Sequence, residues 1–159
     1  MKQETQSSLG QLRTEQRNQA SAHFDQESTL DLVGIMNRED AKVAAAVRQA
    51  LPKIAQAVDV IAEKLRRGGR LIYIGAGTSG RIAALDASEC PPTFGTAPKM
   101  VQFVIAGGPK ALGAAVEANE DSREFGQRDI AKRKPGKNDV VVGIAASGRT
   151  PYTLSLIHI

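Results

Sequence analysis

Two short segments of the chain carry residue types that bind phosphate. The first reads Gly-Ala-Gly-Thr-Ser-Gly over residues 75–80, and the second reads Ser-Gly-Arg-Thr over residues 147–150. Each follows a short apolar run and precedes a predicted helix, so hydroxyls and the free N–H groups of a helix N-terminus can surround an anion there. We therefore predict that the two segments hold one phosphate group through Gly77, Thr78, Ser79, Gly80, Ser147, Gly148, Arg149 and Thr150.

The first segment also matches the spacing of a dinucleotide-binding loop, with glycines at positions 75, 77 and 80. That class of protein needs an acidic residue at the end of its second strand to bind the ribose. Here the second predicted strand is followed by Ala106-Gly107-Gly108-Pro109. The sequence thus favours a compact phosphate over a dinucleotide, and two glycine-rich turns with capping hydroxyls remain an alternative.

Glu89 is a candidate catalytic carboxylate. It lies between the two segments along the chain, just ahead of Cys90-Pro91-Pro92. A proline pair disfavours a helix, so we expect a stiff loop that presents Glu89 near the carboxyl ends of the strands, where it can act as an acid. A surface or capping carboxylate is the alternative. Cys90 has no evident histidine partner, which favours a structural thiol over a nucleophile, and no cluster of ligands indicates a metal site.

The composition is that of a helix-rich α/β protein. Of the 159 residues 42% are hydrophobic, 4% are aromatic and none is Trp, which argues against a β-sandwich. The one basic run, Lys132-Arg133-Lys134, has no interleaved aromatic side chains, so no nucleic-acid partner is expected. The polar N-terminus without a secretory signal, the lack of a membrane-length apolar run and the single cysteine lead us to expect a cytoplasmic protein with no membrane partner.

Hydrophobic patterning predicts the elements that position these residues. Residues 1–27 are polar and indicate an extended arm, and residues 28–68 indicate three helices that begin near residues 28, 37 and 51. Buried strands are predicted at residues 71–74, 101–105 and 140–144. Helices are predicted near residues 79–85, over residues 110–132, with a break near Asn119 as an alternative, and from Pro151 onward. This alternation predicts a three-layer α/β/α, doubly wound parallel sheet with ligands at the carboxyl ends of its strands.

Three stretches resemble one family of sugar-phosphate enzymes. They are residues 71–81, residues 85–95, which include Asp-Ala-Ser-Glu-Cys-Pro-Pro-Thr, and residues 141–152. They resemble the N-acetylmuramic acid 6-phosphate etherases, which have the sugar isomerase (SIS) fold, and the resemblance extends from about Thr14 to Tyr152. It implies cleavage of the D-lactyl ether of N-acetylmuramic acid 6-phosphate, to N-acetylglucosamine 6-phosphate and D-lactate, in cell-wall sugar recycling.

The resemblance also implies two functional glutamates, which match Glu89 and Glu120. Near the second, Ala118 and Asn119 replace the family's Gly and Ala, and in the arm Asn18-Gln19 replaces Asn-Pro. One carboxylate would remove the C2 proton of the open-chain sugar, and the other would protonate the C3 ether oxygen before water adds. We assign Glu120 as the base and Glu89 as the acid, and the reverse assignment stays open. The resemblance implies no metal and no cofactor for this chemistry.

Members of that family continue past the position of Tyr152 with a helix, further strands and a C-terminal helical region. We therefore expect residues 69–152 to be the N-terminal part of an SIS domain with an incomplete sheet, and residues 153–159 to be a truncated tail. A homodimer is expected at full length, and no activity from these 159 residues alone. Two alternatives remain, a non-catalytic SIS module that senses a sugar phosphate and an aldose–ketose isomerase.

Overall fold

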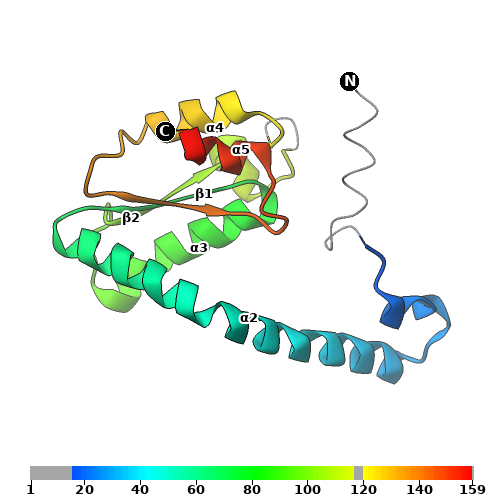
Figure 1. Cartoon of the computed structure of the whole chain (residues 1–159). Helices are drawn as coiled ribbons and strands as arrows, with labels where there is room; N and C mark the ends of the chain where they lie inside the picture. Colours follow the sequence, from blue (N-terminus) through cyan, green and yellow to red (C-terminus); the bar gives the residue numbers. More distant parts are fainter. Residues whose placement is uncertain (1–15, 117–119, 159) are drawn as a thin grey trace. The chain divides into compact units, whose positions relative to one another are not determined.

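The computed structural model describes residues 16–116 and 120–158. The chain divides into two compact units, Met1–Val58 and Asp59–Ile159. Helix α2 (Thr29–Arg66) crosses the boundary, so its last eight residues belong to the second unit (Figure 1). The second unit contains the sheet and both predicted phosphate-binding segments.

The first unit contains two short 3₁₀ helices and most of α2. η1 (Gln19–Ser21) and η2 (Phe24–Gln26) lie in the arm that was predicted to be extended. α2 begins as predicted after Ser28, whose Oγ accepts a hydrogen bond from the N–H of Asp31 at 3.2 Å. The helix then continues for 38 residues, so the boundaries predicted near residues 37 and 51 are wrong. Its apolar stripe keeps a helical spacing through residues 43, 47, 51, 54 and 58, and Pro52 removes only one backbone hydrogen bond from it.

The second unit is built on a parallel sheet. Its described strands are β1 (Leu71–Gly75), β2 (Val101–Ile105) and β3 (Val140–Ile144), arranged in the order β2-β1-β3. Gly75 at the end of β1 pairs with Ile105 on one side and with Ile144 on the other, so all three strands end at the same edge. The predicted strands and their parallel arrangement are confirmed.

Alternate residues of the strands face two helical layers. Ile72, Ile74 and Val104 pack with Ile130 of α4 (Arg123–Ala131) and Tyr152 of α5 (Pro151–Leu154). Leu71 and Val101 pack on the other face, with Ala87 of α3 (Gly77–Phe94) and the last turns of α2. Figure 1 shows α3 on one side of the sheet and α4 with α5 on the other. The three-layer α/β/α fold predicted from the sequence is therefore confirmed.

α3 is longer than predicted because it passes through the proline pair. It includes Pro91 and Pro92 and ends at Gly95, which has a left-handed φ of 65° and donates its N–H to the carbonyl of Pro91 at 2.9 Å. The loop expected around Glu89 is therefore absent, and Glu89 is a helical residue. Each proline lacks the N–H that would donate to the carbonyl four residues earlier, so α3 loses two hydrogen bonds in its last turns and still ends at Gly95.

A single continuous helix over residues 110–132 is not formed. The structure has η3 (Gly108–Leu112) and then α4, which begins after Ser122, and the break weighed near Asn119 lies outside the described residues. The hydroxyl of Ser122 caps α4 by accepting the N–H of Phe125 at 3.2 Å. After α5 the chain forms a 3₁₀ helix, η4 (Ser155–His158).

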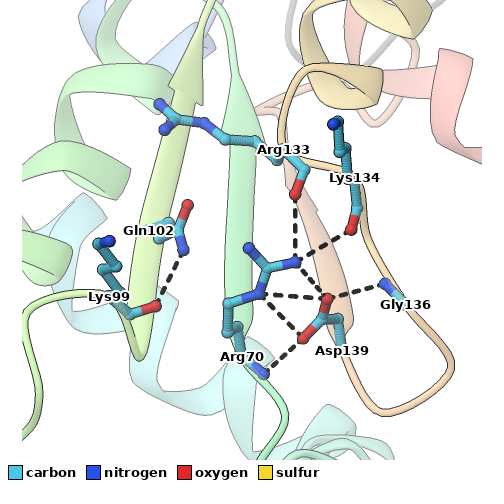
Figure 2. Close-up of polar contacts among 7 residues, drawn as sticks. All are labelled: Arg70, Lys99, Gln102, Arg133, Lys134, Gly136 and Asp139. Carbon is cyan, nitrogen blue, oxygen red and sulfur yellow. Dashed lines mark hydrogen bonds and ion pairs between the residues drawn. The ribbon is translucent and has the colours of Figure 1, made fainter.

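An ion pair links the residues that directly precede β1 and β3 (Figure 2). It lies at the amino ends of the strands, whereas the phosphate segments follow their carboxyl ends. Arg70 Nη2 lies 2.6 Å from Asp139 Oδ2, and the backbone N–H groups of Arg70 and Gly136 donate to the same carboxylate at 2.7 and 2.8 Å. Arg70 also donates to the carbonyls of Arg133 and Lys134, each at 3.1 Å. Mainly because of the hydrogen bond from Arg70, the pKa of Asp139 falls from 3.8 to about 2.

Replacing Asp139 with Asn should therefore lower the free energy of unfolding at pH 7 by about 2 kcal/mol. Because the folded-state pKa is lowered, this contribution is complete above pH 4 and is lost as the pH falls from about 4 to about 2. Urea unfolding followed by circular dichroism should give a difference of about 2 kcal/mol between wild type and variant at pH 7, and under about 0.5 kcal/mol at pH 2. The exposed Asp40→Asn is the control, and an Asp139→Asn effect that is equal at both pH values would contradict this account.

Candidate functional site

The first phosphate-binding segment joins the end of β1 to the start of α3. Gly77 is the first residue of α3 and has a φ of 53°, which favours glycine, while Thr78 is exposed and Ser79 is half-buried. The first intrahelical N–H, that of Gly80, donates to the carbonyl of Ala76 at 3.3 Å. The N–H groups of the residues before it are therefore available to a ligand beyond the end of the strand.

Two glycines let this turn pack directly on the sheet. A methyl group on Gly80 would lie 2.5 Å from Ile105 Cγ1 and 2.9 Å from the carbonyl oxygen of Gly75. A methyl group on Gly75 would lie 2.9 Å from the nitrogen of Gly80. The glycine spacing that resembles a dinucleotide fingerprint is thus explained by close packing of helix against strand.

The second segment follows β3, the neighbour of β1. Gly148 has a φ of 66°, and the N–H of Arg149 donates to Ser147 Oγ at 3.2 Å. Thr150 precedes Pro151, the first residue of α5, and its carbonyl accepts the N–H of Leu154 at 2.9 Å. Gly148 and Arg149 are exposed, whereas Ser147 and Thr150 are half-buried.

The two segments lie at the position where the strand order reverses. From β1 the chain crosses to β2 on one side, and β3 then pairs with the other side of β1. Ligands of doubly wound sheets bind in the crevice at such a reversal, beyond the carboxyl ends of the strands. The structure therefore places the ends of β1 and β3 side by side, and the eight predicted phosphate-binding residues follow these two strand ends.

Glu120 lies beside the second segment. Its carbonyl accepts the N–H of Tyr152 at 3.0 Å, and the residue is half-buried in a turn rather than in the predicted helix. The Tyr152 ring is buried, and its hydroxyl donates to Asp129 Oδ2 at 3.0 Å. Burial, with the nearby Asp129 charge, raises the pKa of Tyr152, so its hydroxyl stays neutral. The hydrogen bond to Asp129 links α5 to α4. Glu117, Ala118 and Asn119 lie outside the described residues.

The structure places Glu89 away from the other predicted site residues of the same chain. It is exposed, and it follows Gly77 by 12 residues along α3, which corresponds to about 18 Å of helix. Ile82 and Leu85 share its helical face and are 54% and 62% exposed. One chain therefore holds Glu120 next to the phosphate segments and Glu89 far from them.

Cys90 has the environment of a structural thiol. It packs against the core formed by Leu71, Ala87 and Val101. Burial, with a smaller contribution from the charge of Asp86, raises the pKa of its thiol, which lowers the fraction of reactive thiolate. The interpretation of Cys90 as structural agrees with this environment.

Among the described residues no group of three or more His, Cys, Asp and Glu side chains could hold a metal ion. None of the described helices combines the length and the apolar character that a membrane span requires. A cavity of about 540 Å³ lies along β2 and α4, and none of the predicted site residues lines it. Its basic side chains have partners in the fold: Lys132 pairs with Asp129 at 2.8 Å, and Arg133 donates to the carbonyl of Phe103 at 3.1 Å.

Comparisons with known proteins agree with the fold and with the predicted resemblance. The chain is 60% identical to a Rhodopirellula baltica protein over 146 residues, which cover 92% of this chain and 48% of that protein. It is 60% identical to a Symbiobacterium thermophilum protein over 151 residues, with 94% and 50% covered, and 56% identical to a Clostridium beijerinckii protein over 146 residues, with 92% and 48% covered. All three are named N-acetylmuramic acid 6-phosphate etherase.

The chain spans about half the length of these curated relatives. Residues 53–159 match the family described as the glucokinase regulatory protein N-terminal SIS domain. These residues contain all of the sheet and both phosphate-binding segments. The chain therefore belongs to the family of glucokinase regulatory protein N-terminal SIS domains.

Proposed function

We propose that the chain is part of an N-acetylmuramic acid 6-phosphate etherase. The whole protein would cleave the D-lactyl ether of that sugar phosphate to N-acetylglucosamine 6-phosphate and D-lactate, in cell-wall sugar recycling. Relatives with that name, 56% to 60% identical over nine tenths of this chain, support the substrate. The observation that carries the proposal is the meeting of both phosphate-binding segments and the Glu120 turn at the ends of β1 and β3.

In this proposal the phosphate group anchors the sugar for two proton transfers. N–H groups and hydroxyls of Thr78, Ser79 and Ser147 hold the 6-phosphate, so that C2 of the open-chain sugar comes to a fixed carboxylate. Glu120 removes the C2 proton, which the neighbouring aldehyde acidifies. The C3–O bond then breaks, Glu89 donates a proton to the departing lactate oxygen, and water adds at C3.

We further propose that Glu89 reaches this site from a second copy of the chain. Glu89 lies about 18 Å along α3 from the phosphate segment of its own chain, too far for a shared substrate. The exposed side chains of Ile82 and Leu85 on the same helical face provide apolar area that a homodimer would bury beside Glu89. We also propose a cytoplasmic location, because Cys90, the one cysteine of these 159 residues, is a free thiol.

The proposal is tested with a hybrid protein that keeps every predicted site residue of this chain. It joins residues 1–152 of this chain to the rest of the Rhodopirellula baltica relative, beyond the aligned region. We expect the hybrid to release D-lactate from N-acetylmuramic acid 6-phosphate but not from unphosphorylated N-acetylmuramic acid, and the 159-residue chain alone to release none. A hybrid that binds the phosphate ester without releasing lactate would support the sensor alternative, and a keto sugar as product would support the isomerase.

A further inference from the structure

Arg81 makes a set of long-range hydrogen bonds that the proposed mechanism does not use. It follows Gly80 directly in the first turns of α3. Its Nε donates to the carbonyl of Ala111 at 3.0 Å and to that of Leu112 at 3.3 Å, and its Nη2 donates to the carbonyl of Ala114 at 2.9 Å. A guanidinium group has donors in a fixed planar arrangement, so it can hold several carbonyls of one bent segment at once.

The segment that Arg81 holds leads directly toward Glu120. Ala111 is 2% exposed, and a methyl group on Gly107 would lie 2.7 Å from Val116 Cγ1, so the described part from Gly107 to Val116 folds back on itself. Beyond it, the carbonyl of Glu120 accepts the N–H of Tyr152 at 3.0 Å. Hydrogen bonds to the rest of the fold are thus made at Ala111, Leu112 and Ala114, and again at Glu120.

The two attachment points come from the two phosphate-binding elements. Arg81 belongs to α3, which begins with the first phosphate segment, and Tyr152 belongs to α5, which follows the second. α3 therefore contacts the chain before Glu120, as far as Ala114, and α5 contacts Glu120 itself. Of the two, only Arg81 acts through its side chain, because the contact of Tyr152 with Glu120 uses backbone atoms.

We propose that Arg81 is a positioning residue for Glu120, which sets the distance between this carboxylate and a sugar whose phosphate is bound at the start of α3. The inference rests on the proposed function, since it assigns Glu120 a proton transfer. Arg81 itself takes no part in the reaction. Without it, phosphate binding should persist, while Glu120 loses its fixed position relative to C2.

The test uses the hybrid protein with Arg81→Met and Arg81→Lys. Arg81→Met keeps the apolar stem and removes all three hydrogen bonds, and we expect kcat to fall about 10- to 100-fold while KM changes less than about threefold. Arg81→Lys keeps the charge and fewer donors, so kcat should lie between those of Arg81→Met and wild type. Arg123→Met, at an exposed arginine of α4, is the matched control and should leave both constants unchanged.

Hydrogen–deuterium exchange of the 159-residue chain separates this inference from the proposed function. In Arg81→Met the backbone amides of residues 110–116 should exchange at least about tenfold faster, with those of β1 and β3 unchanged. If the wild-type hybrid releases no lactate, the proposed function fails, and unchanged exchange in Arg81→Met would separately overturn the attachment by Arg81. A normal kcat despite faster exchange, or a loss of phosphate-ester binding parallel to kcat, would overturn the positioning role.

Discussion

Glu89→Gln in the hybrid protein should reduce D-lactate release by about 10²- to 10⁴-fold, the usual contribution of a general acid or base. Glutamine has nearly the same shape but cannot donate the proton that the departing lactate oxygen needs. Binding of the phosphate ester should be retained, because Glu89 lies about 18 Å along α3 from Gly77 and contributes nothing to the phosphate segment of its own chain.

The measurement pairs an enzymatic assay for D-lactate with calorimetric binding of N-acetylglucosamine 6-phosphate, which carries the phosphate but has no ether to cleave. Glu124→Gln is the matched control, since Glu124 is also an exposed glutamate on a helix of the same unit. Lactate release that is equal in Glu89→Gln and Glu124→Gln would remove Glu89 from the mechanism. A loss of binding in Glu89→Gln would instead make it a binding residue.

Two inactive variants should regain activity when they are mixed. If each site takes Glu120 from one copy and Glu89 from the other, a heterodimer of Glu89→Gln and Glu120→Gln contains one site with both glutamates intact. Random exchange at equal concentrations makes half of the dimers heterodimers, so about a quarter of wild-type activity should return. The gain would be far above the residual rate of either variant alone, which general acid–base catalysis sets at about 10⁻² to 10⁻⁴ of wild type.

Subunit exchange is followed by native mass spectrometry of copies with different affinity tags, together with the lactate assay. The control mixes two preparations of Glu89→Gln, which cannot form an intact site. A mixture that contains heterodimers but stays as inactive as this control would show that both glutamates of a site come from the same chain. The proposed role of a second copy would then be wrong.

The sheet could be predicted from the sequence because its strands are short apolar runs bounded by turns. Val101–Ile105 and Val140–Ile144 were predicted to the residue from their continuous apolar runs, although β3 is half-buried and not buried as predicted. The meeting of the phosphate segments followed from the same reasoning, because parallel strands end at one edge. Neither prediction depended on a contact between distant side chains.

The helix boundaries predicted from the prolines are wrong, although proline is a strong local signal for the end of a helix. Proline at Pro52 and Pro91 predicted breaks, but α2 keeps one apolar stripe across Pro52, and α3 continues to its glycine cap at Gly95. On its inner face α3 packs the small side chains of Ala83 and Ala87 against the sheet. These contacts come from residues far along the chain, so no local reading of the proline could include them.

The candidate site was only partly accessible to prediction. Glu120 was selected by family resemblance alone. The backbone hydrogen bond that places it beside Tyr152 joins residues 32 apart in the sequence, so no local pattern could predict it. Arg81 was missed because its three carbonyl partners lie 30 to 33 residues away. The distance of Glu89 from the phosphate segments depends on α3 staying helical as far as Glu89, which the proline pair that follows at Pro91 and Pro92 argued against.

The most direct test of the proposed elimination and hydration is cleavage by the hybrid protein in water labelled with oxygen-18. Because the C3–O bond breaks and water adds at C3, the label should enter the C3 hydroxyl of N-acetylglucosamine 6-phosphate, and D-lactate should keep the unlabelled ether oxygen. Mass spectrometry of the two separated products distinguishes the routes. Labelled D-lactate with an unlabelled C3 hydroxyl would mean that water attacks the lactyl carbon, and would contradict the mechanism proposed for Glu89 and Glu120.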